Sequence, residues 1–151
     1  MHRALLVVDP IDPTKQFVKE AGEIVDAVGA EFLLLHVTSE SEYNETQKAL
    51  NDLNTSEGGS YGVSQAEAGA KQLAEEVGRD VFGADGPSFE SVGRVGDTSS
   101  QVLKVAEDRE CDHIFIAGRK RSPSGKAIFG DAAQRVILNS SVPVTVTTYE
   151  D

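Results

Sequence analysis

The chain alternates between short apolar runs and longer segments in which apolar residues recur every three or four positions. The runs at 4–8, 32–37 and 114–117 are nearly continuous, which is typical of strands buried on both faces of a parallel sheet. The spacing of three or four is typical of helices with one buried face. The pattern predicts strands at 4–8, 32–37, 89–95, 113–117 and 142–147, and helices at 17–28, 64–82, 98–106 and 132–138.

Strands that alternate with helices imply a parallel sheet with right-handed crossovers and helices on both faces. The predicted order is β-α-β-(loop)-α-β-α-β-α-β, and 151 residues suit a single domain. Before the first helix, Pro10 and Pro13 force a turn, and Asp12 or Thr14 is expected to cap that helix. The chain is therefore interpreted as a one-domain α/β protein.

One segment departs from this pattern. Residues 39–61 are polar, acidic and rich in glycine and serine, and only 43–53 could form a short helix of low apolar content. Because so little of this segment could be buried, we expect a long surface excursion here.

The composition narrows the choice of partners. Fourteen Lys and Arg against 25 Asp and Glu give a formal net charge of −11, which argues against general nucleic-acid binding. Such a charge suits a solvent of high ionic strength, and one hypothesis is that this is an acidic protein of haloarchaeal type. No apolar run reaches transmembrane length and the N-terminus leads straight into a strand. A cytoplasmic protein without a membrane partner is therefore expected.

A basic, glycine-containing loop follows the strand that begins at His113. Most of the basic charge in this region lies between Gly118 and Gly130, where a further helix is predicted to begin. A strand, a glycine-rich loop and a helix N-terminus together bind phosphate in open α/β sheets. The alternative is a solvated basic loop that pairs with acidic surface. The cationic residues concerned are Arg119, Lys120, Arg121 and Lys126.

Two other strand ends carry polar residues. Asp9 ends the first strand, where it could accept hydrogen bonds from a ribose or an adenine amino group, or simply organise the turn before Pro10. His36 lies near the end of the second strand and is expected to pack or to bond to backbone rather than to a ligand. Backbone near Val37 could flank a base.

Several kinds of site are not indicated by the sequence. The three histidines and Cys111 show no metal-ligand spacing, and the lone cysteine is interpreted as structural. Gly125-Lys126 is followed by Ala127, so the loop is not a Walker A motif, and no nucleophile elbow or GxGxxG motif is present. We therefore expect a binding protein without a resident metal rather than an enzyme; weak phosphohydrolase activity is the least favoured alternative.

Over nearly its whole length the chain resembles the universal stress protein family. The resemblance implies a flavodoxin-like fold, also described as adenine nucleotide alpha hydrolase-like, with five parallel strands in the order 3-2-1-4-5. It further implies a stress-related role and dimerisation through the last strand, while nucleotide binding belongs to only one branch of the family. The motifs that carry the resemblance are LVVD at 6–9, LLHV at 34–37, VGDT at 95–98, DHIFIAG at 112–118 and PVTV at 143–146.

The nucleotide-binding branch has a Gly, two residues, a Gly, nine residues, and then Gly followed by Ser or Thr. Here the first position is Gly118, but Arg121 replaces the second glycine, Gly130 lies one residue early and Asp131 takes the hydroxyl position. Asp131 is also expected to cap the helix that begins there. Loop and resemblance together give the candidate nucleotide site Asp9, Pro10, Val37, Gly118, Arg119, Lys120, Arg121, Gly125, Lys126, Gly130 and Asp131.

Two functions remain open at this point. The first is a stress-linked protein that binds ATP, with magnesium, or a related nucleotide, and forms a homodimer through residues 142–148. The alternative is a member that has lost nucleotide binding and acts through protein partners or another anion, because Arg121 and Asp131 depart from the family pattern.

Overall fold

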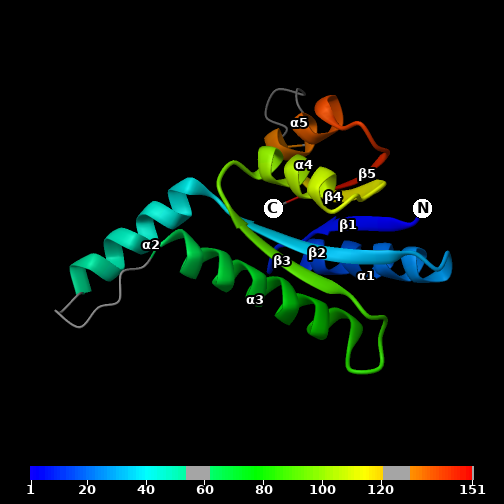
Figure 1. Ribbon diagram of the computed structural model, residues 1–151, viewed down its shortest axis with the longest axis horizontal. Coiled ribbons are helices and arrows are strands. Elements are labelled where there is room, and N and C mark those ends of the chain that lie inside the picture. The colour runs from blue at the N-terminus through cyan, green and yellow to red at the C-terminus, as the bar shows by residue number, and fades with distance from the viewer. Residues whose placement is uncertain (54–61, 121–129, 151) are drawn as a thin grey trace.

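The computed structural model describes residues 1–53, 62–120 and 130–150, and these form a single five-stranded parallel sheet flanked by helices (Figure 1). The strand order is β3-β2-β1-β4-β5, which confirms the predicted fold class and the order implied by the resemblance. The elements are β1 (Arg3–Val7), α1 (Asp12–Ala27), β2 (Glu31–Thr38), α2 (Glu40–Leu53), α3 (Val63–Phe82), β3 (Glu90–Val95), α4 (Thr98–Asp108), β4 (His113–Arg119), α5 (Asp131–Asn139) and β5 (Val144–Tyr149).

The sheet separates two apolar layers. Helices α4 and α5 pack on one face through residues such as Val102 and Val136, while α1 and α3 pack on the other through residues such as Val18 and Val77. Alternate residues of the central strands serve the two layers, so Leu5 belongs to the first cluster and Leu6 to the second. This burial on both faces explains the continuous apolar runs in the sequence.

Helix α2 lies in the segment where a surface excursion was predicted. None of its residues with a described side chain is buried, and Figure 1 shows it projecting beyond the sheet. Ser39 accepts a hydrogen bond from the Glu42 amide at 3.2 Å and donates one to the Glu42 carboxylate at 3.1 Å. A local signal of this kind, Ser-x-x-Glu, starts a helix without help from a core. Residues 54–61 lie outside the described residues.

Two further details differ from the predictions. Helix α1 begins at Asp12 after Ile11, without a side-chain cap, so neither Asp12 nor Thr14 caps it. Strand β5 begins at Val144 rather than Val142. Among the helices described, none is both long and apolar enough to cross a membrane.

Candidate functional site

A cavity of about 270 Å³ lies at the carboxyl edge of the sheet, where β1, β2 and β4 end beside the start of α5. This edge is where open parallel sheets bind ligands, because helix N-termini and strand ends meet there. Six of the eleven sequence-predicted site residues line the cavity: Asp9, Val37, Gly118, Arg119, Gly130 and Asp131. Its other lining residues are Val7, Glu42, Thr98, Ile116, Ala117, Ala132, Ala133 and Tyr149.

Asp9 reaches the cavity from the end of β1. The Val8 amide still bonds to the Leu35 carbonyl at 2.8 Å, after which the chain leaves the sheet. The Asp9 side chain is 49% exposed, and its Oδ1 lies 3.5 Å from His36 Nδ1. Burial raises the pKa of the Asp9 carboxyl, the His36 ring lowers it, and Glu42 raises it further. Asp9 is thus a hydrogen-bond acceptor partly withdrawn from water.

Buried polar side chains gather around this same edge. In the described parts of the chain they are Thr14, His36 and Ser99, with 1%, 7% and 5% exposure. Thr14 and His36 bond to backbone of the turn after β1, which confirms the expectation that His36 bonds to backbone. Ser99 donates to Asp97 at 2.8 Å. Burying a polar group without a hydrogen-bond partner is costly. All three buried side chains have such partners, and their bonds hold the turns at this edge in place.

Helix α5 begins at the cavity against the end of β4. Gly130 has φ 78°, and a Cβ there would lie 3.1 Å from the Arg119 nitrogen. Only glycine therefore lets the two segments approach so closely. The N-cap is Gly130 and no side chain caps the helix, so the prediction that Asp131 caps it is wrong. Amides of the first turn have no partner within a helix, and this leaves donors beside the cavity.

The structure places only some of the predicted basic residues at the cavity. Arg119 lines the cavity. Lys120 does not: its amide bonds to the Tyr149 carbonyl at 2.7 Å and its ammonium group lies 3.7 Å from Glu150. Pro10 is exposed and does not line the cavity either. Arg121, Gly125 and Lys126 lie outside the described residues.

The start of α4 adds a polar rim. Asp97 is the N-cap and accepts from the Ser100 amide at 3.1 Å. Hydrogen bonds from Ser99 and Ser100 hold the pKa of Asp97 below its ordinary value, and Arg135 lies 3.6 Å away. The next residue, Thr98, lines the cavity. The sequence marked this helix start but not that Thr98 shares a cavity with Arg119 and Asp131, because β3 and β4 are separated by two strands in the sheet.

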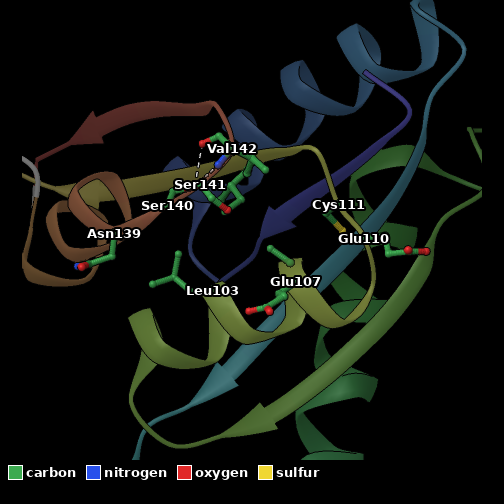
Figure 2. Close-up of a pocket in the computed structure, with 10 residues that line it drawn as sticks. Leu103, Glu107, Glu110, Cys111, Asn139, Ser140, Ser141 and Val142 are labelled. Carbon is green, nitrogen blue, oxygen red and sulfur yellow. Dashed lines mark hydrogen bonds between the residues drawn. The ribbon is translucent and has the colours of Figure 1, made fainter.

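A second cavity, of about 220 Å³, lies at the opposite, amino edge of the sheet between the C-terminal ends of α4 and α5 (Figure 2). Its charged lining residues are Glu107 and Glu110. Cys111 is buried in its wall, and burial raises the pKa of the thiol to about 11. Ser140 turns its hydroxyl to the Val142 backbone, at 2.7 Å from the carbonyl. This lining offers little to an anion.

Among the residues that the structure describes, no cluster of three or more His, Cys, Asp or Glu could hold a metal ion. The polar groups at the carboxyl edge are instead the carboxylates of Asp9, Glu42 and Asp131, two hydroxyls, backbone amides and Arg119. Such a set suits an organic ligand that carries both hydrogen-bond donors and an anionic group.

Comparison with known proteins agrees with this geometry. The universal stress protein from Methanothermobacter thermautotrophicus is 22% identical over 139 residues, which cover 91% of this chain and 89% of that protein. Universal stress protein UspA from Lactobacillus plantarum has the same fold, with a TM-score of 0.68, 18% identity and 97% of each chain covered.

A third relative, the universal stress protein from Archaeoglobus fulgidus in complex with dAMP, superposes with a TM-score of 0.51, at 15% identity and with 97% of each chain covered. The sequence pattern of the universal stress protein family matches residues 1–148. The strand order, the polar carboxyl edge and this match agree, and the chain belongs to the universal stress protein family.

Proposed function

We propose that this protein binds a nucleotide in the carboxyl-edge cavity, with ATP as the first candidate, and acts as a stress-linked binding protein rather than an enzyme. The observation that carries the proposal is the gathering of all three described buried polar side chains around this edge. Thr14 and His36 bond to the turn that carries Asp9, and Ser99 bonds to Asp97 next to Thr98, so these groups support residues of the cavity lining. The relative from A. fulgidus, which holds dAMP, adds support.

Each end of a nucleotide has a counterpart in the lining. Asp9 would accept hydrogen bonds from the ribose hydroxyls or the adenine amino group, and Val37 would lie against the base. The phosphates would meet the first amides of α5 and Arg119. Magnesium would arrive on the phosphates of ATP, since this ion is usually held by them with one or two carboxylates.

A second candidate function is favoured by the acidic lining. Asp131 and Glu42 bring two carboxylates to the cavity, and Lys120 is engaged by Glu150. These groups weaken a triphosphate site. A protein that has lost nucleotide binding and works through a partner would tolerate them, and the exposed residues of helix α2 offer such a partner a surface.

Equilibrium titration with ATP and magnesium in molar KCl, followed by a turnover assay, separates these proposals. Binding without hydrolysis supports the first, and the absence of binding favours the second. Mass spectrometry of small molecules released from protein purified without added nucleotide is the independent check. A released adenine nucleotide would identify the ligand class directly.

We also propose that the protein is a homodimer paired through β5. In the sheet described, β5 bonds to β4 on one side and presents its other edge without a strand. An open edge of this kind needs a partner or a guard. Sedimentation in high salt at micromolar concentration tests this, and a monomer would contradict it.

A further inference from the structure

The turn between β1 and α1 is held by two buried side chains. Thr14 Oγ1 donates to the Asp9 carbonyl at 2.8 Å and also lies 2.9 Å from the Ile11 carbonyl. His36 Nδ1 lies 2.8 Å from the Val8 carbonyl and, because a carbonyl only accepts, must carry the proton of this bond. Two consecutive carbonyls, those of Val8 and Asp9, are thus bonded to side chains instead of to the sheet.

Packing alone does not require these polar groups. Thr14 is 1% exposed, and a valine would fill nearly the same volume without a hydroxyl to satisfy. A buried hydroxyl or imidazole contributes only when its hydrogen bonds are made. Both groups make these bonds to the short stretch of backbone from which the Asp9 side chain projects.

The hydrogen bonds of Thr14 and His36 to this turn affect the position of the Asp9 carboxylate. It lines the cavity half exposed, 3.5 Å from the His36 ring that also bonds to Val8. Burial is the largest cause of the raised Asp9 pKa, and Glu42 of α2, which also lines the cavity, adds to it. The two bonds fix the backbone from which the Asp9 side chain projects, and so limit the directions that its carboxylate can take.

We propose that Thr14 and His36 are positioning residues that hold the Asp9 carboxylate in the cavity for the nucleotide. The inference rests on the proposed function, because Asp9 is the group that would accept from the base or ribose. Neither residue touches the cavity itself, as neither is among its lining residues. Thr14 acts through the backbone of the turn, and His36 acts both through this backbone and directly on the Asp9 carboxylate, 3.5 Å away.

A matched pair of variants at Thr14 tests this. Thr14→Val removes the hydroxyl at constant shape, and Thr14→Ser keeps it. The first readout needs no ligand: the Asp9 carboxyl is titrated by carbon-detected NMR. We expect a pKa above the ordinary 3.8 in the wild type and in Thr14→Ser, and a return toward 3.8 in Thr14→Val. A purely structural role would lower stability without moving Asp9.

The second readout is affinity for ATP with magnesium and for AMP. Thr14→Val should weaken both by about five- to tenfold, as expected when a bonded group loses its position, while Thr14→Ser stays within about twofold. His36→Leu and His36→Asn form a second pair, since the asparagine amide can still donate to Val8. If Thr14→Val proves too unstable, the His36 pair decides.

The two hypotheses fail separately. If the wild type binds neither nucleotide, the proposed function is wrong, and the Asp9 titration still decides whether the pair holds the carboxylate. If the wild type binds but Thr14→Val binds as tightly with an unchanged Asp9 pKa, and His36→Leu binds as tightly as His36→Asn, the positioning inference is wrong. The Asp9 pKa is compared only in the Thr14 pair, because loss of the His36 ring changes it directly.

Discussion

The two ends of the sheet are built from the same elements and yet differ in chemistry. At the carboxyl edge, α5 begins at Gly130 and its first residues line a cavity together with Asp9 and Arg119. At the amino edge, α4 and α5 end beside a cavity whose charged residues are both glutamates. Helix starts carry partial positive charge and helix ends partial negative charge, so the fold itself makes one edge suited to anions and the other unsuited.

The charged side chains do not add to this difference, since Asp9, Glu42 and Asp131 outnumber Arg119 at the carboxyl edge, but the buried polar side chains do. Described polar side chains that are buried lie near the carboxyl edge and hold its turns, whereas the amino edge buries a thiol. Cavity size does not distinguish the two sites, since they measure about 270 and 220 Å³. The two sites differ in the number of hydrogen bonds by which buried side chains hold the residues around the cavity in place.

The largest expected contrast concerns Cys111. Its thiol pKa is raised from 9.0 to about 11, so its thiolate fraction at neutral pH should be about a hundredfold below that of an ordinary cysteine. Maleimide labelling at pH 7 should therefore be slow. Ser141→Cys in a Cys111→Ser background is the control, because position 141 is exposed at the same cavity. Equal labelling rates for the two cysteines would show that the amino edge is not chemically inert.

A second contrast uses two glycines with nearly the same φ angle. Gly130 and Gly29 have φ of 78° and 76°, but a Cβ meets Arg119 backbone only at Gly130 and open space at Gly29. Alanine should cost about 1–2 kcal/mol of stability at either position. Only Gly130→Ala should also weaken ATP binding, by about tenfold, because it pushes the start of α5 from the end of β4. Equal affinities of the two variants would remove Gly130 from the site.

Replacing Asp131 is expected to increase the affinity for ATP. The Asp131 carboxylate lines the cavity and does not cap α5, so it opposes phosphate even though an acid in the first turn favours the helix. Asp131→Ser should tighten ATP binding several-fold, corresponding to about 1 kcal/mol of relieved repulsion. Glu107→Gln, which removes a carboxylate at the amino edge, should leave the affinity unchanged. Calorimetric titration in molar KCl measures both, and equal affinity of Asp131→Ser and the wild type would refute the charge argument.

The smallest expected effect concerns stability against acid. The pKa of Asp97 is lowered by its hydrogen bonds, so its contribution is present above its ordinary value of 3.8 and is lost as the pH falls through the lower folded value. Asp97→Ala should cost about 1 kcal/mol near neutral pH. The gap between the two proteins should close below about pH 3.8. Urea melts at pH 7 and pH 3 check this, with Asp97→Asn as the variant that keeps the cap.

Hydrophobic periodicity was enough to predict the sheet and its flanking helices, because buried faces repeat along the sequence. It underestimated α2, in which no described side chain is buried and whose start depends on the local pair Ser39 and Glu42. Helix formers such as Gln47 and Lys48 sustain it without a core.

The candidate site was predicted only in part. Residues next to strand ends, such as Asp9 and Gly118, were found because strand ends converge in a parallel sheet. The pairing of Lys120 with Glu150 was not, since it depends on β4 and β5 being neighbours. Thr14 was misread as a helix cap because its spacing before the apolar positions suits one, while its hydroxyl donates to carbonyls instead.

The most direct test is an amide NMR titration of the wild-type protein with ATP and magnesium in molar KCl. Saturable shifts should centre on the carboxyl edge, at Val37, Gly118 and the first residues of α5, while Cys111 and Val142 at the amino edge stay unchanged. Shifts centred on the amino edge, or no saturable shift at either edge, would contradict the assignment of the carboxyl-edge cavity as a nucleotide site.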